Sequence, residues 1–177
     1  SKLWKGLFYC FWMSDKPLVQ QQLAQELSEL VLMVAGIDTR SDEAQVASLR
    51  HALAALDFYQ GFWHTMQAEW LGVDKFRIDK YYLLMRRFLQ AGCQLLLVHG
   101  CDALLVERYV HIMRGTDGPL SSNNVHVPDS ITYHICDAFL AELDAAVAAH
   151  ADASPAVPTI ELLAPCMDLA APSTSPP

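Results

Sequence analysis

Apolar side chains recur at intervals of three and four residues along most of this chain, a spacing typical of helices that bury one face. The series Leu23, Leu27, Leu30, Val31 and Val34 is one example. Similar series lead us to expect helices that begin near Leu3, Pro17, Ser41, Asp74, Asp102, Asp129 and Pro158. No stretch alternates with a period of two, so the sequence predicts no β-sheet.

Turn-forming and polar residues mark where these helices begin and end. Pro17 fits a first helical turn, where its missing N–H would have no partner, and Ser14 or Asp15 could cap the free amides beside it. The other candidate caps are Asp74, Asp102, and Asp129 or Ser130. The residues that would end helices are Gly36, Gly72 and Gly115.

The same spacing predicts which side chains face the core. Five of the eleven residues from Leu3 to Met13 are aromatic, and we expect a segment that is apolar on nearly all sides to lie in the middle of the domain. We expect Trp4, Trp12, Trp63 and Trp70 to be mostly buried. Two further inward sets are Tyr81, Leu84, Met85 and Phe88, and Ile131, Ile135, Phe139, Leu140 and Leu143.

The predicted class is all-α, in one domain over residues 1–171 followed by a disordered Pro-Ser-Thr tail over 172–177. Antiparallel helix pairs with short turns could stack as a helical repeat or close as a bundle, and no fixed repeat length decides between them. Because the chain does not start with Met, we expect it to be part of a longer protein.

The net charge of −8 is unevenly distributed. No basic residue follows Arg114, and residues 115–177 hold eight of the twenty acidic side chains. Such a surface would repel phosphate and attract basic partners, although it could equally be a solvated face that keeps the protein soluble. The acidic docking candidates are Asp137, Glu142 and Asp144.

Five of the twelve basic residues lie in one short stretch, between Phe62 and Arg87. On a helix begun near Asp74, Lys80 would share a face with Arg77 and Arg87. This stripe could contact RNA phosphates, bind an acidic surface, or form ion pairs within the fold. The candidates for binding a partner or RNA are Lys5, Lys75, Arg77, Lys80, Arg86 and Arg87.

Other chemistry finds little support. The five cysteines are scattered, as expected for thiols in a reducing compartment. His99 with Cys101 and His134 with Cys136 are spaced i, i+2, which points the two side chains of a helix apart, so we expect no metal site. No catalytic motif or phosphate loop is present, and the apolar segment at Leu3–Met13 is too short to cross a membrane. We therefore expect no enzymatic activity, no cofactor, no small-molecule substrate and no membrane contact.

Four ordered motifs resemble those of the ribosomal RNA processing protein 1 family. The first comprises Leu3–Tyr9 and Trp12–Pro17. The second comprises Phe62-Trp63, Thr65-Met66, Glu69-Trp70, Gly72, Asp74, Arg77, Asp79-Lys80 and Tyr82. The third comprises Tyr133-His134, Asp137, Phe139-Leu140 and Glu142-Leu143, and the last is Leu162–Pro165.

The resemblance implies a helical-repeat (HEAT- or armadillo-like) domain of a nuclear, nucleolar protein that matures pre-ribosomal RNA, chiefly for the large subunit. It implies a scaffold within pre-ribosomal particles without enzymatic activity. Together with the acidic charge of residues 115–177, it leads us to expect that the chain binds basic assembly factors or ribosomal proteins. Direct binding of pre-ribosomal RNA by the stripe from Lys75 to Arg87 is the alternative. Two features depart from the family: residues from about 39 to 57 look like an extension, and Cys166 stands where Phe is common.

Overall fold

The computed structural model describes residues 2–37, 48–122, 124–150 and 156–170. These residues form only helices and the segments that join them. The elements are α1 (Lys2–Trp12), α2 (Pro17–Val34), α3 (Leu49–Glu69), the 3-10 turn η1 (Trp70–Gly72), α4 (Ile78–Val98), α5 (Ala103–Arg114), α6 (Asp129–Ala149) and α7 (Thr159–Ala170). The all-α class is confirmed.

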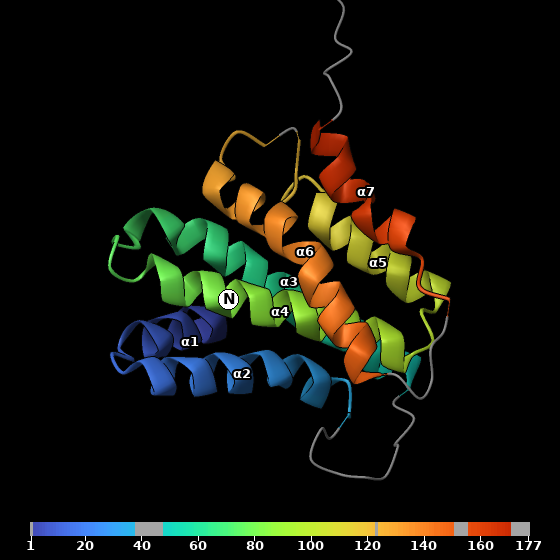
Figure 1. Cartoon of the computed structure of the whole chain (residues 1–177), viewed down its shortest axis with the longest axis horizontal. Helices are drawn as coiled ribbons and strands as arrows, with labels where there is room; N and C mark the ends of the chain where they lie inside the picture. The colour runs from blue at the N-terminus through green and yellow to red at the C-terminus, as the bar shows by residue number, and fades with distance from the viewer. Residues whose placement is uncertain (1, 38–47, 123, 151–155, 171–177) are drawn as a thin grey trace, which may run out of the picture.

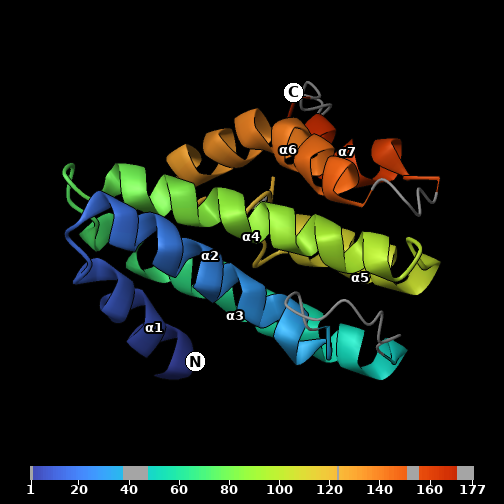
Figure 2. The same cartoon turned by 60° about the horizontal axis from the view of Figure 1, so that its bottom comes forward.

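The helices form two layers, and consecutive helices run in opposite directions (Figure 1). One layer holds α1, α3, α5 and α7, and each of these packs against the next. The other layer holds α2, α4 and α6, with α4 between its two neighbours (Figure 2). Each helix therefore lies beside the helix two positions away in the chain, which is how stacked helix pairs form a solenoid. The arrangement is consistent with the predicted helical repeat.

The core is centred on α4, whose apolar side chains are buried on almost every side. Phe88 of α4 stacks on Phe62 of α3 with ring centroids 3.6 Å apart, and Trp4 of α1 meets the Phe88 ring edge-on at 5.6 Å. A Cβ on Gly92 would lie 2.9 Å from the Tyr109 ring, so only glycine lets α4 approach α5 this closely. The predicted inward set from Tyr81 to Phe88 is confirmed.

Some predicted helix ends are confirmed and others are wrong. The carboxylate of Asp102 accepts from two free amides at the start of α5, and Pro17 opens α2. Ser14 does not cap α2, because its hydroxyl donates back to the Phe11 carbonyl at 2.7 Å. Asp74 lies in a turn before α4, where Oδ1 accepts from the Phe76 amide at 2.9 Å. Pro128, without a side-chain cap, precedes α6 in place of Asp129 or Ser130.

Two predictions about burial are also wrong. The first helix lies at the edge of the domain and buries one face only, so Leu3 and Tyr9 are exposed (Figure 2). Leu140 points outward because α6 ends its layer. Among the tryptophans, Trp4, Trp63 and Trp70 are buried, whereas Trp12 is half-buried.

Several expectations concern residues outside the described ranges. They are the helix start at Ser41, the first part of the extension over 39–57 (residues 39–47), and the tail over 172–177. The last part of that extension, from Leu49, forms the first turns of α3. In the described residues, no helix combines the length and the apolar character that crossing a membrane requires.

Candidate partner-binding surfaces

Lys80, placed by the sequence in a surface stripe, lies inside the molecule. Only 6% of the residue is exposed, because the side chain runs under the end of α1. Its ammonium donates to the carbonyl oxygens of Phe11 at 3.0 Å, Trp12 at 2.7 Å and Ser14 at 2.8 Å. Carbonyls at the end of a helix lack partners and carry partial negative charge, so they suit a buried cation. The prediction of a continuous basic face through Lys80 is wrong.

Further polar contacts join residues of the first motif to α3 and α4. The Tyr81 hydroxyl donates to the Phe8 carbonyl at 3.0 Å, and the Trp4 indole donates to the Phe58 carbonyl at 3.0 Å. Lys5 pairs with Glu69 at 3.0 Å, and this hydrogen bond is the main reason that the pKa of Glu69 is lowered. These contacts join α1 to α3 and α4.

Arg77 and Lys75 lie at the turn before α4. Arg77 pairs with Asp74, and its guanidinium carbon lies 4.8 Å from the centre of the Trp12 ring. Lys75 is exposed, with its ammonium 5.0 Å from the centre of the exposed Phe76 ring. Of these two basic residues, Lys75 is the one left facing solvent without a carboxylate partner in the described residues.

The third motif docks α6 on α4. Arg86 Nε lies 2.6 Å from Glu142 Oε1, and Glu142 is only 5% exposed. The His134 ring stacks on Tyr82 at 4.1 Å, with Nε2 3.1 Å from the Tyr82 carbonyl oxygen, and burial lowers the pKa of His134. Glu142 is therefore part of the helix interface, and its prediction as a docking residue is wrong.

A groove of about 290 Å³ remains between α4 and α6. Arg86 and Arg87 lie along it, together with the carboxylate of Asp79. The Nε of Arg87 is buried and has no hydrogen-bond partner in the described part of the chain, whereas Nη1 donates to Gln90 at 3.2 Å. This groove is what remains of the predicted basic stripe.

The outer face of α6 carries the other two acidic candidates. Tyr133, Asp137, Leu140 and Asp144 follow the spacing i, i+4, i+7, i+11 and thus share one face. All four are exposed, with Tyr133 at 68% and Leu140 at 50%. Two carboxylates therefore alternate with two large apolar side chains on the last helix of its layer, and we call these four residues the α6 face.

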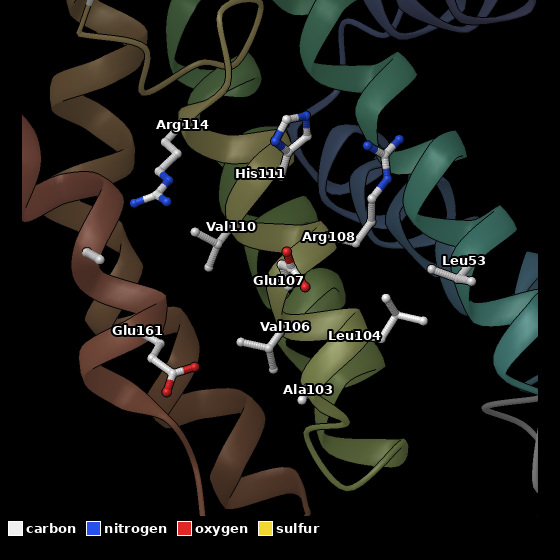
Figure 3. Close-up of a pocket in the computed structure, with 11 residues that line it drawn as sticks. Leu53, Ala103, Leu104, Val106, Glu107, Arg108, Val110, His111, Arg114 and Glu161 are labelled. Atoms are coloured by element: carbon white, nitrogen blue, oxygen red, sulfur yellow. The ribbon is translucent and has the colours of Figure 1, made fainter.

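A larger groove, of about 550 Å³, lies on the opposite layer (Figure 3). It follows α5 between α3 and α7, and no sequence pattern singled it out because its walls come from three separate helices. Its lining residues are Leu53, Ala103, Leu104, Val106, Glu107, Arg108, Val110, His111, Arg114, Glu161 and Ala164. We call it the α5 groove.

Four of the five cysteines are used in packing, and Cys10 is exposed. Within the described residues, no three His, Cys, Asp or Glu side chains come together as metal ligands would. Burial raises the pKa of the Cys93 thiol to about 12. Cys136 of α6 and Cys166 of α7 share a hydrogen bond, which raises the pKa of Cys166. These thiols thus contribute to the core and to the contact between the last two helices.

The two-layer stack defines an α-solenoid, a class whose members present extended surfaces built from repeated helix pairs. The family model described as "Nucleolar protein, Nop52" matches residues 1–176, and the chain belongs to this family. The family resemblance drawn from the four motifs is therefore confirmed. So is the nucleolar assignment, in that the family is one of nucleolar proteins.

Individual relatives carry the name expected from the motifs. Human ribosomal RNA processing protein 1 homolog A is 35% identical over 142 residues, which cover 80% of this chain and 27% of that protein. The Drosophila melanogaster homolog is 30% identical over 145 residues, covering 80% of this chain and 18% of that protein. The Dictyostelium discoideum homolog is 27% identical over 157 residues, covering 80% of this chain and 29% of that protein. The chain thus spans less than a third of the length of these relatives.

Proposed function

We propose that this chain is a scaffold domain of a ribosome-biogenesis factor that acts in pre-ribosomal RNA processing, within nucleolar particles of chiefly the large subunit. One observation carries the proposal: the Nop52 family model spans residues 1–176, and the relatives are named for ribosomal RNA processing. In this role the domain binds proteins and catalyses no reaction, and it needs neither a cofactor nor a small-molecule substrate.

The distribution of polar contacts supports a scaffold. Lys80, Arg77 and Arg86 were candidates for binding a partner or RNA, but all three bond within the fold. Lys80 joins α4 to α1, Arg77 pairs with Asp74 in the turn before α4, and Arg86 joins α4 to α6. Such contacts make a firm body whose outer faces are free to bind. We propose that the α6 face binds basic ribosome-assembly factors or ribosomal proteins, because Asp137 and Asp144 complement positive charge and lie beside exposed apolar area.

The protein-binding role is tested by capture of partners from nuclear extract on the full-length protein. We expect Asp137→Lys/Asp144→Lys to lose basic partners that the wild type retains, because reversing two exposed charges repels a basic surface. Glu26→Lys/Glu29→Lys is the matched control, since these carboxylates on α2 bond to Gln22 and Gln25 of their own helix. Equal recovery of basic partners by both double variants contradicts the assignment to the α6 face.

A second candidate, direct binding of pre-ribosomal RNA, is favoured by the position of Arg87. Arg87 has a buried nitrogen without a partner in the described residues, beside Arg86 in the groove between α4 and α6. Each phosphate contact releases counterions, so RNA binding would weaken steeply with salt. The net charge of −8 leads us to expect weak binding.

The RNA-binding candidate is tested with Lys75→Gln/Arg87→Gln, which changes two basic residues and spares Lys80. Binding of the full chain to a pre-ribosomal RNA segment is measured as a function of salt. A shallower salt dependence in the variant supports RNA contact. Absence of binding at low salt rejects it.

A further inference from the structure

The α5 groove has an apolar floor with helices on both sides. Val106 and Val110 point from α5 toward α7, Leu104 points toward α3, and Glu107 lies between them (Figure 3). Leu53 of α3 and Ala164 of α7 complete the lining. The volume of about 550 Å³ falls in the range of about 300–1,000 Å³ that is typical of ligand sites.

The charges in this groove are unbalanced. Arg108 is neutralised by Asp57, 2.7 Å away, and Arg114 faces Asp168 at 3.5 Å. Glu107 and Glu161 are exposed and form no ion pair with another described residue. Two carboxylates therefore remain beside an apolar floor, and they complement a ligand that combines apolar and basic side chains.

The walls decide the conformation of that ligand. The backbone groups of α3, α5 and α7 are already bonded within their helices, so an extended peptide would find few partners for its own N–H and C=O groups. A helix satisfies its backbone internally and can insert side chains at i, i+3/i+4 and i+7 into an apolar groove. From Ala103 to Arg114 the groove follows about 16 Å of helix axis, which is about three helical turns.

We propose that the α5 groove binds a short amphipathic helix, contributed by a partner protein, whose apolar stripe is flanked by Lys or Arg residues. The partner's apolar side chains contact Leu104, Val110 and Ala164, and its basic residues pair with Glu107 and Glu161. The inference rests on the proposed scaffold role for its biological setting, because it adds a second protein-binding surface on the layer opposite to the α6 face. The geometry and charge that carry it are those of the groove alone.

The test uses the full chain and a fluorescent synthetic peptide of about twelve residues, with leucines at i, i+3/i+4 and i+7 and lysines elsewhere. Binding is followed by fluorescence anisotropy at an ionic strength of about 0.15 M, where distant surface charges are screened. The groove variants are Glu107→Lys/Glu161→Lys, which reverses the charge, and Ala164→Trp, which fills the space. Glu26→Lys/Glu29→Lys has the same net charge as the first variant and leaves the groove intact.

We expect each groove variant to weaken binding at least ~10-fold, while the α2 control stays within ~2-fold of wild type. A peptide of the same composition with its leucines scattered around the helix should bind as weakly as the groove variants do. Thermal unfolding of each variant shows whether it remains folded. If Ala164→Trp does not fold, the test still rests on the charge-reversal variant, which changes two exposed residues.

Three results overturn the proposal: equal binding of the ordered and scattered peptides, equal affinity of the charge-reversal variant and the control, or a dimer of the chain that Ala164→Trp dissociates. The last would assign the groove to a second copy. Sedimentation with pre-ribosomal particles distinguishes a failure of the groove proposal from a failure of the proposed scaffold role. Sedimentation with particles but no peptide binding contradicts the groove assignment alone, whereas peptide binding without such sedimentation contradicts the scaffold role alone.

Discussion

The ammonium group of Lys80 shows how a charged residue of a motif can serve the fold. Burying a cation is unfavourable unless its hydrogen-bonding capacity is satisfied. Lys80 meets this condition with three carbonyl acceptors from the end of α1 and the following turn. Sequence spacing placed it correctly relative to Arg77 and Arg87. The spacing could not show that α1, which lies more than sixty residues earlier in the chain, would cover Lys80.

Replacing Lys80 should destabilise the domain. We expect Lys80→Met to lower the free energy of unfolding by about 2–4 kcal/mol, because buried carbonyls lose their donor. Urea unfolding measures the change. Lys75→Met is the matched control, since Lys75 is exposed and its replacement should change stability by only about 0.5 kcal/mol. Similar effects of the two substitutions would show that Lys80 does not anchor α1.

The cysteines should differ sharply in reactivity. Alkylation requires the thiolate, and burial both raises the pKa of Cys93 to about 12 and blocks access to it. Cys10 is exposed on α1. At about pH 8, iodoacetamide should therefore modify Cys10 in the folded protein and Cys93 only after denaturation. Mass spectrometry of the modified peptides distinguishes these outcomes, and rapid native labelling of Cys93 would contradict the packing around α4.

At the level of helices, the sequence predicted the inward faces better than the helix ends. The prediction that Tyr81, Leu84, Met85 and Phe88 are buried was correct because α4 is enclosed by its neighbours, so its apolar face is a core face. The prediction that Leu140 faces the core was wrong because no helix of its layer covers one side of α6. The spacing of apolar residues along one helix cannot show which neighbouring helices are present. Asp102 was predictable as a cap, whereas Ser14 and Ser130 bond elsewhere in the fold.

Trp70 links the end of α3 to α6. Its ring is buried, and its indole N–H donates to the Ser130 hydroxyl at 2.8 Å. We expect Trp70→Ala to cost about 3–5 kcal/mol in unfolding free energy, through the lost burial and the cavity it leaves. Trp70→Phe keeps much of the apolar volume, so the difference between the two variants estimates the packing contribution. Unchanged melting of Trp70→Ala would make Trp70 a surface residue.

The contact between α4 and α6 should weaken in mild acid. Burial lowers the pKa of His134 below 6.5, and burial has the same effect on His99. As the pH falls below about 6.5, the unfolded chain binds protons more readily than the folded one, so the free energy of unfolding decreases. Urea unfolding between about pH 7.5 and about pH 5.5 measures this loss.

His134→Gln is the control for that pH dependence. Its amide N–H can still donate to the Tyr82 carbonyl but does not titrate in this range. We expect the unfolding free energy of the variant to fall less in acid than that of the wild type. Part of the decrease should remain, because His99 still titrates. An identical pH dependence in the two proteins would assign the effect to other groups.

At the scale of the whole molecule, the structure separates charges that hold the fold from charges that face solvent. Lys80, Arg77 and Arg86 bind α1, Asp74 and α6, so the density of basic residues in this stretch of the sequence does not make a basic surface. Asp137 and Asp144 remain on the outside of α6. The composition predicted the acidic character of residues 115–177. It could not predict that Glu142 would be buried in the helix interface, nor that three helices would form the α5 groove, because both depend on how the helices pack.

The most direct test of the scaffold role is sedimentation of tagged full-length protein from nuclear extract, with and without RNase. We predict that the wild-type protein sediments with large pre-ribosomal particles and moves to light fractions when RNase disrupts them. The Asp137→Lys/Asp144→Lys variant should be reduced in the particle fractions without RNase, with unchanged melting. Sedimentation of the wild-type protein as a small free species under both conditions would contradict the account.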